Sequence, residues 1–166
     1  MLINMNKQLK FRTEALQSDP DAVNEIVAST GFFHDYEIPV AVELVEERLA
    51  KGIESGYHFI FAEMDGKTIA YSCFGEIPCT SGSYDLYWIA THNQYRGKGI
   101  GKAVLLETEK AIEKLKGRGI YVETASQEKY APTRYFYESN HYILEARIKD
   151  FYSKGDDKML YVKRFD

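Results

Sequence analysis

Hydrophobic and polar positions divide the 166-residue chain into short segments, separated mostly by glycine and proline. Residues 9–13 alternate between apolar and polar side chains, which predicts an opening strand. Asp19-Pro20 then supplies a capping residue and a proline suited to a first helical turn, so a helix is predicted to run to about Thr30. A second helix, ending near Gly52, is predicted from an apolar face that consists of Val40, Val42, Leu44, Val45 and Leu49.

The middle of the chain has the composition of strands. Residues 57–64 and 67–76 are rich in apolar and β-forming side chains, and Asp65-Gly66 between them is typical of a two-residue hairpin turn. These two strands should therefore pair antiparallel. Residues 84–91 predict a further strand, which leads directly into a glycine-rich loop.

Helical spacing returns after that loop and gives way to strands near the C-terminus. Gly117 is predicted to end the helix that follows the loop. The core side of this helix is predicted to consist of Val104, Leu105, Thr108, Ala111, Ile112 and Leu115. Residues 120–125 predict a strand, residues 130–139 a helix, and residues 142–148 and 159–164 a closing pair of strands.

The glycine-rich loop is the stretch Arg96-Gly97-Lys98-Gly99-Ile100-Gly101, with glycine at alternate positions. Without a Cβ atom, glycine can take positive φ and turn successive backbone N–H groups inward, while a following helix adds unpaired amides and its positive dipole end. Arg96, Lys98 and Lys102 can add charge-assisted contacts to a pyrophosphate. The loop therefore predicts a phosphate site; the alternative is a glycine-rich turn that only joins strand to helix.

Two known phosphate loops differ from this stretch in spacing. The P-loop needs a glycine where Arg96 stands and a magnesium-binding hydroxyl where Ala103 stands. The dinucleotide fingerprint, counted from Gly97, needs its third glycine where Lys102 stands, and no alternating β-α-β pattern with a ribose-binding acid follows. The motif that remains is R-x-x-G-x-G after a strand.

Length and composition are those of one enzyme-sized domain spanning residues 1–166, with residues 1–8 expected to be loosely ordered. Charged residues make up 28% of the chain and the net charge is −4, which does not fit a nucleic-acid binder. No apolar run is long enough to cross a membrane and the first residues lack the apolar core of a signal peptide, so we expect a cytoplasmic protein without membrane contacts. Cys73 and Cys79 are expected to be reduced thiols, with Cys73 packed in a strand, and no metal site is expected.

Two linked motifs in this element order resemble those of the GNAT superfamily of acyl-CoA-dependent N-acetyltransferases. Residues 86–91, ahead of the glycine loop, look like the family's central strand, and Tyr135-Phe136-Tyr137-Glu138 resembles its later helix motif. The resemblance covers nearly the whole chain. It implies an α/β (α+β) fold with a mixed, mostly antiparallel central sheet of about six or seven strands, flanked by about four helices, with a splayed central strand pair.

The resemblance implies acetyl-CoA as donor and co-substrate. In the family the glycine loop binds the pyrophosphate of coenzyme A through backbone amides, which here are those of Arg96, Gly97, Lys98, Gly99, Ile100, Gly101 and Lys102. A bulge in the family's central strand leaves backbone groups that can hydrogen-bond the pantetheine arm. The corresponding residues of this chain are Ile89, Ala90 and Thr91.

The implied reaction is direct attack of a neutral primary amine on the acetyl thioester in a ternary complex, without a metal or a covalent enzyme intermediate. Tyr137 matches the family tyrosine that faces the coenzyme sulfur and donates a proton, although an amphipathic core tyrosine is the alternative. Asp85 stands where some members carry a base, and its alternative is a solvated strand-end aspartate. Glu123 on the next strand is the second candidate for the base, because it interrupts a mostly apolar run.

Acceptor pockets in the family are lined by the loop between the first two helices and by the last hairpin, here residues 32–38 and 150–158. Both stretches are aromatic and acidic, so they could hold a cationic amine or form a solvated rim. The side chains predicted to line the acceptor site are Phe33, Tyr36, Tyr87 and Phe151. We therefore expect a small amine, an amino acid or a peptide N-terminus as the acceptor.

The chain departs from the family pattern at three positions near its end. Tyr130 and Thr133 stand where the family often has Asn and Ala, and His141 replaces the usual glycine before Tyr142. The left-handed turn is therefore expected to move to Asn140. These changes leave open a protein that binds acyl-CoA without turnover, as a regulatory or interaction module. The resemblance also leaves open a homodimer.

Overall fold

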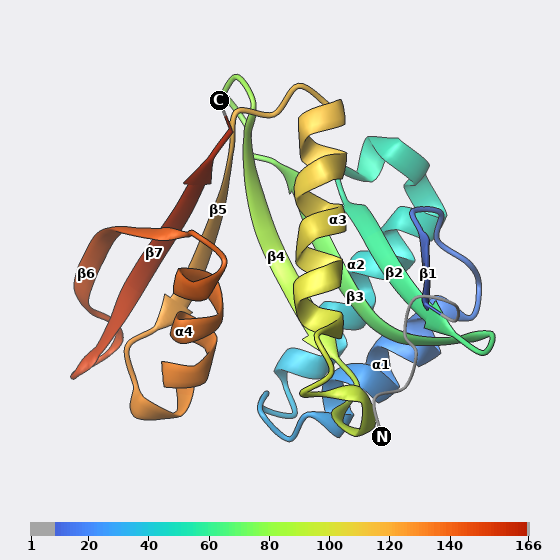
Figure 1. Ribbon diagram of the computed structural model, residues 1–166, viewed down its shortest axis with the longest axis horizontal. Helices are drawn as coiled ribbons and strands as arrows, with labels where there is room; N and C mark the ends of the chain where they lie inside the picture. The colour runs from blue at the N-terminus through green and yellow to red at the C-terminus, as the bar shows by residue number, and fades with distance from the viewer. Residues whose placement is uncertain (1–8, 166) are drawn as a thin grey trace. The chain divides into compact units, whose positions relative to one another are not determined.

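The computed structural model describes residues 9–165 and contains a mixed sheet with the strand order β1-β2-β3-β4-β5-β7-β6 (Figure 1). Its strands are β1 (Leu9–Arg12), β2 (His58–Met64), β3 (Lys67–Glu76), β4 (Ser83–Thr91), β5 (Gly119–Ala125), β6 (Ile143–Ser153) and β7 (Asp156–Arg164). Its helices are α1 (Asp19–Ser29), α2 (Glu37–Lys51), α3 (Ile100–Lys114) and α4 (Ala131–Ser139). Because β4 and β5 are parallel and the pairs β1–β2, β2–β3, β5–β7 and β6–β7 are antiparallel, the predicted fold class is confirmed.

The described residues form two compact units. The first contains the chain up to Gly75 together with Tyr87–Ala111, and the second contains Glu76–Leu86 together with the chain from Ile112 onwards. The organisation as a single domain stays a prediction. Residues 1–8, which were expected to be loosely ordered, lie outside the described part of the chain.

In the first unit, β2 and β3 are buried on both faces, because α1 and α2 cover one side and α3 covers the other (Figure 1). The core on the α1–α2 side contains Phe59, Phe61, Tyr71 and Cys73 from the strands with Val23, Ile26, Val27, Ala41 and Val45 from the helices. On the α3 side, the Ser72 and Thr108 hydroxyl oxygens are 2.6 Å apart. Burial of each large apolar side chain stabilises the unit by about 1.5–3 kcal/mol.

The β2–β3 turn forms as predicted. Asp65 and Gly66 have φ values of 52° and 77°, and Met64 pairs with Lys67 across the turn. Positive φ at both central residues is the requirement of the tight hairpin turn that an Asp-Gly pair favours. Local sequence is therefore sufficient to specify this turn.

The start of α1 differs from the prediction that Asp19 caps the helix. Asp19 is the first helical residue and is 0% exposed, and Ser18 before it makes no side-chain cap bond. The Arg12 guanidinium donates to both Asp19 carboxylate oxygens, at 2.8 and 2.9 Å, and Leu16 N donates to Oδ2 at 2.6 Å. Arg12 Nε also donates to Glu63 at 3.0 Å. The ion pair between β1 and α1 thus occupies the carboxylate that a local cap would use.

The left-handed residues at the ends of α3 and α4 are not the predicted ones. After α3, the left-handed residue is Lys116, with φ of 64°. Gly117 is required for a different reason, since a Cβ atom at this position would lie 2.3 Å from Ile112 Cγ2. After α4, His141 takes φ of 70° while Asn140 keeps φ of −102°. Asn140 is held in this conformation because its buried amide group caps the helix end, donating to a carbonyl oxygen of α4 at 2.7 Å.

Two residues predicted to face the core are exposed instead. Val40 lies at the surface of α2, because the buried positions of this helix are Ala41 and Val45. Leu115 follows the last residue of α3, Lys114, so it leaves the helical face that the preceding apolar residues share.

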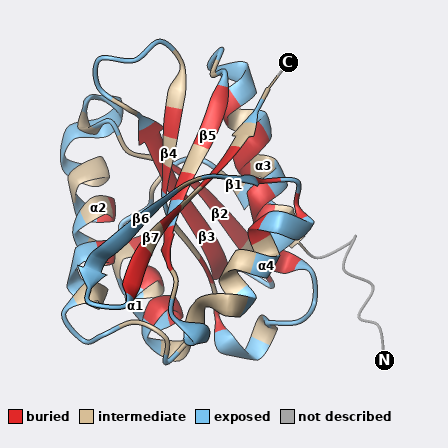
Figure 2. Cartoon of the chain, turned by 90° about the vertical axis from the view of Figure 1, so that its left-hand side faces the viewer, coloured by how far each residue is buried: buried red, intermediate tan, exposed pale blue. Residues whose placement is uncertain are grey.

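In the second unit, β5 and β7 form a buried centre and β6 an exposed edge (Figure 2). The ring of Tyr137 in α4 packs against Tyr161 of β7 and against Tyr142, with centroid distances of 6.1 and 5.5 Å. The closing strands are longer than predicted, since β6 continues to Ser153 and β7 begins at Asp156. Residues 150–158 therefore lie mainly in the two strands of the hairpin, and their place in an acceptor site stays a prediction.

The two cysteines lie in different surroundings. Cys73 is buried in β3 and Cys79 is exposed, and both are free thiols as predicted. Burial raises the pKa of the Cys73 thiol above its ordinary value. Within residues 9–165, no helix is long and apolar enough to cross a membrane, and no group of three or more potential metal ligands comes together.

Candidate functional site

The glycine-rich loop of the first unit connects β4 to α3 through the short helical turn η3 (Asn93–Tyr95). Gly97 and Gly99 have φ values of 71° and 78°, which confirms the predicted left-handed conformation at two of the three glycines. Gly101 lies inside the first turn of α3, and Ala103 N donates to Gly99 O at 3.1 Å. A residue with a side chain would be strained at either left-handed position.

Six consecutive backbone amides of this loop have no acceptor within residues 9–165. Arg96 N donates to Asn93 O at 3.3 Å, and the next backbone amide with an acceptor is Ala103 N. The amides of residues 97–102 lie between these two, at the end of α3 where the helix dipole is positive. Such an arrangement can bind a phosphate or pyrophosphate through backbone groups.

Basic side chains lie beside these amides. Arg96, Lys98 and Lys102 are exposed. Lys98 Nζ donates to Gln94 O at 3.2 Å and lies 5.4 Å from the centroid of the Tyr95 ring. The loop therefore adds positive charge to a site whose binding groups are neutral amides.

His92 anchors the start of the loop. It is buried, its N donates to Ile69 O of β3 at 2.8 Å, and its Nδ1 accepts from Gln94 N at 3.3 Å. Asn93 N donates to the Ser29 hydroxyl of α1 at 3.0 Å. The beginning of the loop is thus fixed to a strand and to a helix of the same unit.

The second half of β4 carries the residues predicted to bind pantetheine. Ala90 is buried, while Ile89 and Thr91 are partly buried. The ladder that β4 forms with β5 pairs residues 83–85 with residues 119–121, so residues 87–91 lie beyond it. A backbone bulge in residues 87–91 stays a prediction.

Two of the aromatic residues predicted to line the acceptor site lie in or against β4. Tyr87 is a partly exposed residue of the strand, and Phe33 packs on Trp88 with ring centroids 4.9 Å apart. Tyr36 is exposed and stacks on His34 instead, at 5.1 Å. The structure thus brings Phe33 to the strand and leaves Tyr36 at the surface of the loop.

Tyr137 lies on α4 in the second unit and is 4% exposed. Burial raises the pKa of its hydroxyl above the ordinary value, so the group stays protonated at neutral pH. In the described part of the chain no hydrogen bond engages this hydroxyl. The hydroxyl of Tyr161 beside it, by contrast, donates to Glu138 at 2.7 Å. Tyr137 therefore keeps a donor available for a ligand.

Asp85 and Glu123 come together in the second unit. Asp85 is paired with Tyr121 of β5, and Glu123 lies two residues further along β5, on the same face of the sheet. Burial and the nearby Glu123 carboxylate raise the pKa of Asp85, whereas Lys158 lowers it. Glu123 Oε2 lies 3.0 Å from Lys158 Nζ, but no hydrogen bond or ion pair engages Asp85 within the described residues. Asp85 is therefore the unpaired carboxylate of the two.

The β6–β7 hairpin contributes Phe151, whose ring centroid lies 3.9 Å from Lys158 Nζ. Asp156 and Asp157, which stand in the same predicted acceptor stretch, are buried and paired. Asp156 accepts hydrogen bonds from the loop after β5, and Asp157 pairs with Arg147. These two carboxylates hold the hairpin in place.

Lys158 is the residue of this site that sequence reasoning missed. It neighbours Glu123 only because β5 and β7 pair Glu123 with Leu160 and Ala125 with Lys158. The alternation of β7, which puts Lys158 on the same face as Leu160, was the available signal. Without knowing the register between β5 and β7, this alternation could not show that Glu123 is the partner of Lys158.

Comparison with known proteins gives three findings. The family model described as an acetyltransferase (GNAT) domain matches residues 55–144. A solved structure of a GNAT-family protein from Desulfovibrio desulfuricans is 44% identical, covers 94% of this chain and 98% of its own, and superposes with a TM-score of 0.93. A comparison with curated protein sequences gave no match.

More distant solved structures share the fold. The ribosomal-protein-S18-alanine N-acetyltransferase from Escherichia coli is 16% identical, with a TM-score of 0.73 and coverage of 94% of this chain and 93% of its own. The PaiA N-acetyltransferase from Thermoplasma acidophilum, solved in complex with coenzyme A, is 19% identical, with a TM-score of 0.71 and coverage of 95% and 99%.

Proposed function

Since the chain belongs to the GNAT family of acetyltransferases, we propose that it moves the acetyl group of acetyl-CoA to the nitrogen of a primary amine. The acceptor class that we propose is a small amine, an amino acid or a peptide N-terminus. The observation that carries the proposal is the run of six unpaired backbone amides at residues 97–102. These amides fit the pyrophosphate of coenzyme A, the ligand with which the Thermoplasma relative was solved.

Asp85 is the proposed proton acceptor. An alkylammonium must lose a proton before its nitrogen can attack the thioester carbonyl carbon. The raised pKa of Asp85, caused by burial and by Glu123, brings this carboxylate closer to the range in which a base works at neutral pH. The unpaired state of Asp85 leaves its oxygens open to the ammonium group.

Tyr137 is the proposed proton donor. When the new C–N bond has formed and the C–S bond breaks, the departing thiolate needs a proton. The Tyr137 hydroxyl can give that proton and regain one from the nitrogen as the amide forms, so protons balance over the reaction. The products are an N-acetyl amine and the free thiol of coenzyme A.

The test is calorimetric titration of acetyl-CoA into the protein, followed by measurement of free coenzyme A thiol with pooled primary amines. We expect micromolar binding and amine-dependent thiol release. Gly99→Asp should weaken binding by roughly 100-fold, because it strains a left-handed position and places negative charge in the phosphate site. Gly66→Asp is the matched control, since Gly66 has φ of 77° in the β2–β3 turn.

The outcomes separate the proposal from its rival. Binding without thiol release for any amine would favour an acyl-CoA-binding regulatory or interaction module. No binding at all would overturn the assignment of the loop. Equal binding by Gly99→Asp and Gly66→Asp would place the coenzyme elsewhere.

A further inference from the structure

Lys158 lies beside the two carboxylates of the second unit, Asp85 and Glu123. Its side chain is 15% exposed, although it carries a charge, and Glu123, its partner at 3.0 Å, is 48% exposed. The ring of Phe151 lies against the ammonium group, with a centroid distance of 3.9 Å. A lysine withdrawn from water to this extent, and fixed by both a carboxylate and an aromatic ring, has a defined position.

The ion pair of Lys158 makes the two carboxylates of the site different from each other. Glu123 has its charge balanced, while Asp85 has no partner in the described residues. We propose that Lys158 is a positioning residue: by pairing with Glu123 it leaves Asp85 as the carboxylate that takes the proton of the acceptor's ammonium group. This inference rests on the proposed function, since it assigns a role within the acetyl transfer.

The charges around Asp85 agree with this arrangement. Glu123 from β5 and Lys158 from β7 are the charged groups that act on Asp85, and they act in opposite directions. Tyr152 of β6 is a further titratable group, whose pKa is raised by burial and by Glu123. Two carboxylates and one ammonium carry a net charge of about −1 at neutral pH, which an incoming alkylammonium would neutralise. The attraction is therefore directed to the unpaired carboxylate.

The position of Lys158 also limits what Phe151 can do. One face of this ring is already covered by the ammonium group of Lys158. An acceptor ammonium placed on that face would meet a like charge at close range. The aromatic residue predicted to bind the acceptor cation therefore orients Lys158, and the cation goes to Asp85.

The experiment is a carbon-13 titration of the Asp85 carboxyl group by NMR, with the pH dependence of kcat/KM measured alongside. Lys158→Met keeps the length and packing of the side chain but removes its charge. The pKa of Asp85 should therefore rise, and the acidic limb of the kcat/KM profile should move to higher pH. Glu123→Gln removes the opposing charge, so both should move to lower pH. The double variant should return towards wild type, because the two effects cancel.

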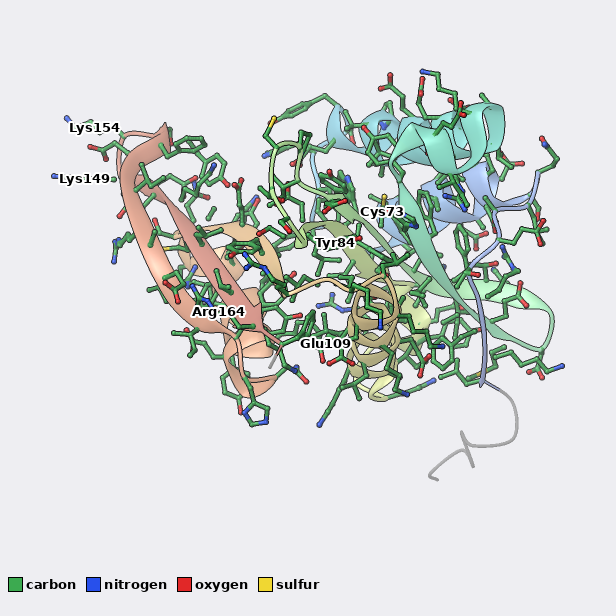
Figure 3. The ribbon with its side chains drawn as sticks, turned by 90° about the horizontal axis from the view of Figure 1, so that it is seen from above. Cys73, Tyr84, Glu109, Lys149, Lys154 and Arg164 are labelled. Carbon is green, nitrogen blue, oxygen red and sulfur yellow. The ribbon has the colours of Figure 1, made fainter. Side chains whose placement is uncertain are left out.

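Two further variants separate the charge of Lys158 from its bulk and from general charge effects. Lys158→Arg keeps a cation that can pair with Glu123 and should leave the Asp85 titration close to wild type. Lys154→Met removes a positive charge from the same hairpin. Lys154, in the turn between β6 and β7, points away from the strands (Figure 3), so this control should leave the titration of Asp85 unchanged.

Opposite shifts in Lys158→Met and Glu123→Gln, with recovery in the double variant, would establish the positioning role. Shifts in the same direction, no shift, or an equal shift in Lys154→Met would overturn it. The NMR titration does not need turnover, so it distinguishes the two proposals. Absence of acetyl transfer by the wild-type protein would refute the proposed function, while the titration would still decide how Lys158 acts on Asp85.

Discussion

Asp19 in the first unit and Asp85 in the second are both withdrawn from water, but their surroundings differ. Asp19 is completely buried and accepts three hydrogen bonds, two from Arg12 and one from Leu16 N. Asp85 is partly buried and has no partner among the described residues, and burial together with the carboxylate of Glu123 raises its pKa. A withdrawn charge is costly unless it is paired. The paired aspartate therefore serves the fold, and the unpaired one is retained at a cost that is typical of a functional site.

Two tyrosines of the second unit repeat this contrast. The hydroxyl of Tyr161 donates to Glu138, while that of Tyr137 has no partner in the part of the chain that the structure describes. Tyr71 in the core of the first unit shows that the lack of a partner is not sufficient, because its hydroxyl is unpaired but its side chain is 0% exposed. The lack of a partner therefore supports a role for Tyr137 only together with its place in the helix motif.

The largest effect is expected from Asp19→Ala. Without this carboxylate, the largely buried Arg12 guanidinium keeps Glu63 as its one remaining ion-pair partner among residues 9–165. The change should cost about 3–5 kcal/mol of unfolding free energy. Urea denaturation measures this loss. Asp21→Ala is the control, since Asp21 is an exposed residue in the first turn of the same helix, and it should cost much less. A small loss of unfolding free energy in Asp19→Ala would contradict the claim that the paired Asp19 stabilises the fold.

Asp85→Asn should give the next largest effect, on turnover. Loss of the proton acceptor is expected to lower kcat/KM by about 100-fold, in line with general base catalysis. Glu123→Gln should lower it much less at neutral pH, because Glu123 is paired with Lys158. Steady-state kinetics with the best amine of the panel provides the comparison. Equal losses in the two variants would mean that the carboxylates share the role.

Tyr137→Phe should lower kcat by about tenfold and leave acetyl-CoA affinity nearly unchanged, because the hydroxyl acts on the departing thiolate. Tyr161→Phe should have the opposite result. It removes the hydrogen bond to Glu138 and should cost about 1 kcal/mol of stability without lowering kcat. Unchanged turnover in Tyr137→Phe would contradict the proton-donor role and make Tyr137 a core residue.

The smallest expected effect is on stability. The pKa of Asp85 is raised in the folded protein, so the unfolded chain binds fewer protons above the ordinary value of 3.8, and stability is lost as pH rises through this window. At pH 7 the charged carboxylate is therefore unfavourable for folding. Asp85→Asn should therefore unfold at a slightly higher temperature than wild type at pH 7. The gain in unfolding free energy should be less than about 1 kcal/mol and should shrink as pH is lowered. A variant less stable than wild type at pH 7 would show that Asp85 has a structural partner.

Local patterns predicted the elements that depend on neighbouring residues. The Asp65-Gly66 turn and the left-handed glycines at positions 97 and 99 were predicted because each requires a conformation that few residues take. The identification of Tyr137 in a helix motif also agrees with the structure, which places it in α4. Such features carry their cause within a few residues of sequence.

Features that depend on pairing between distant segments could not be predicted in the same way. Asp19 has the position of a helix cap, but it pairs with Arg12, which itself is joined to Glu63 across the sheet. Lys158 acts on Glu123 because of one particular register of β5 and β7, and a shift of one residue would turn its side chain to the other face. Sequence alone does not fix that register.

The two cysteines have a consequence for measuring how often the core opens. Cys79 is exposed and should be alkylated quickly. Cys73 is protected, because it is buried and because its raised pKa disfavours the thiolate, which is the reactive form. A second adduct can then form only when β3 is transiently released from its neighbours. Where reclosing is faster than alkylation, the delay between the two adducts, followed by mass spectrometry, reports the free energy of that local opening. The native chain thus contains its own pair of chemical probes, one as reference and one as reporter.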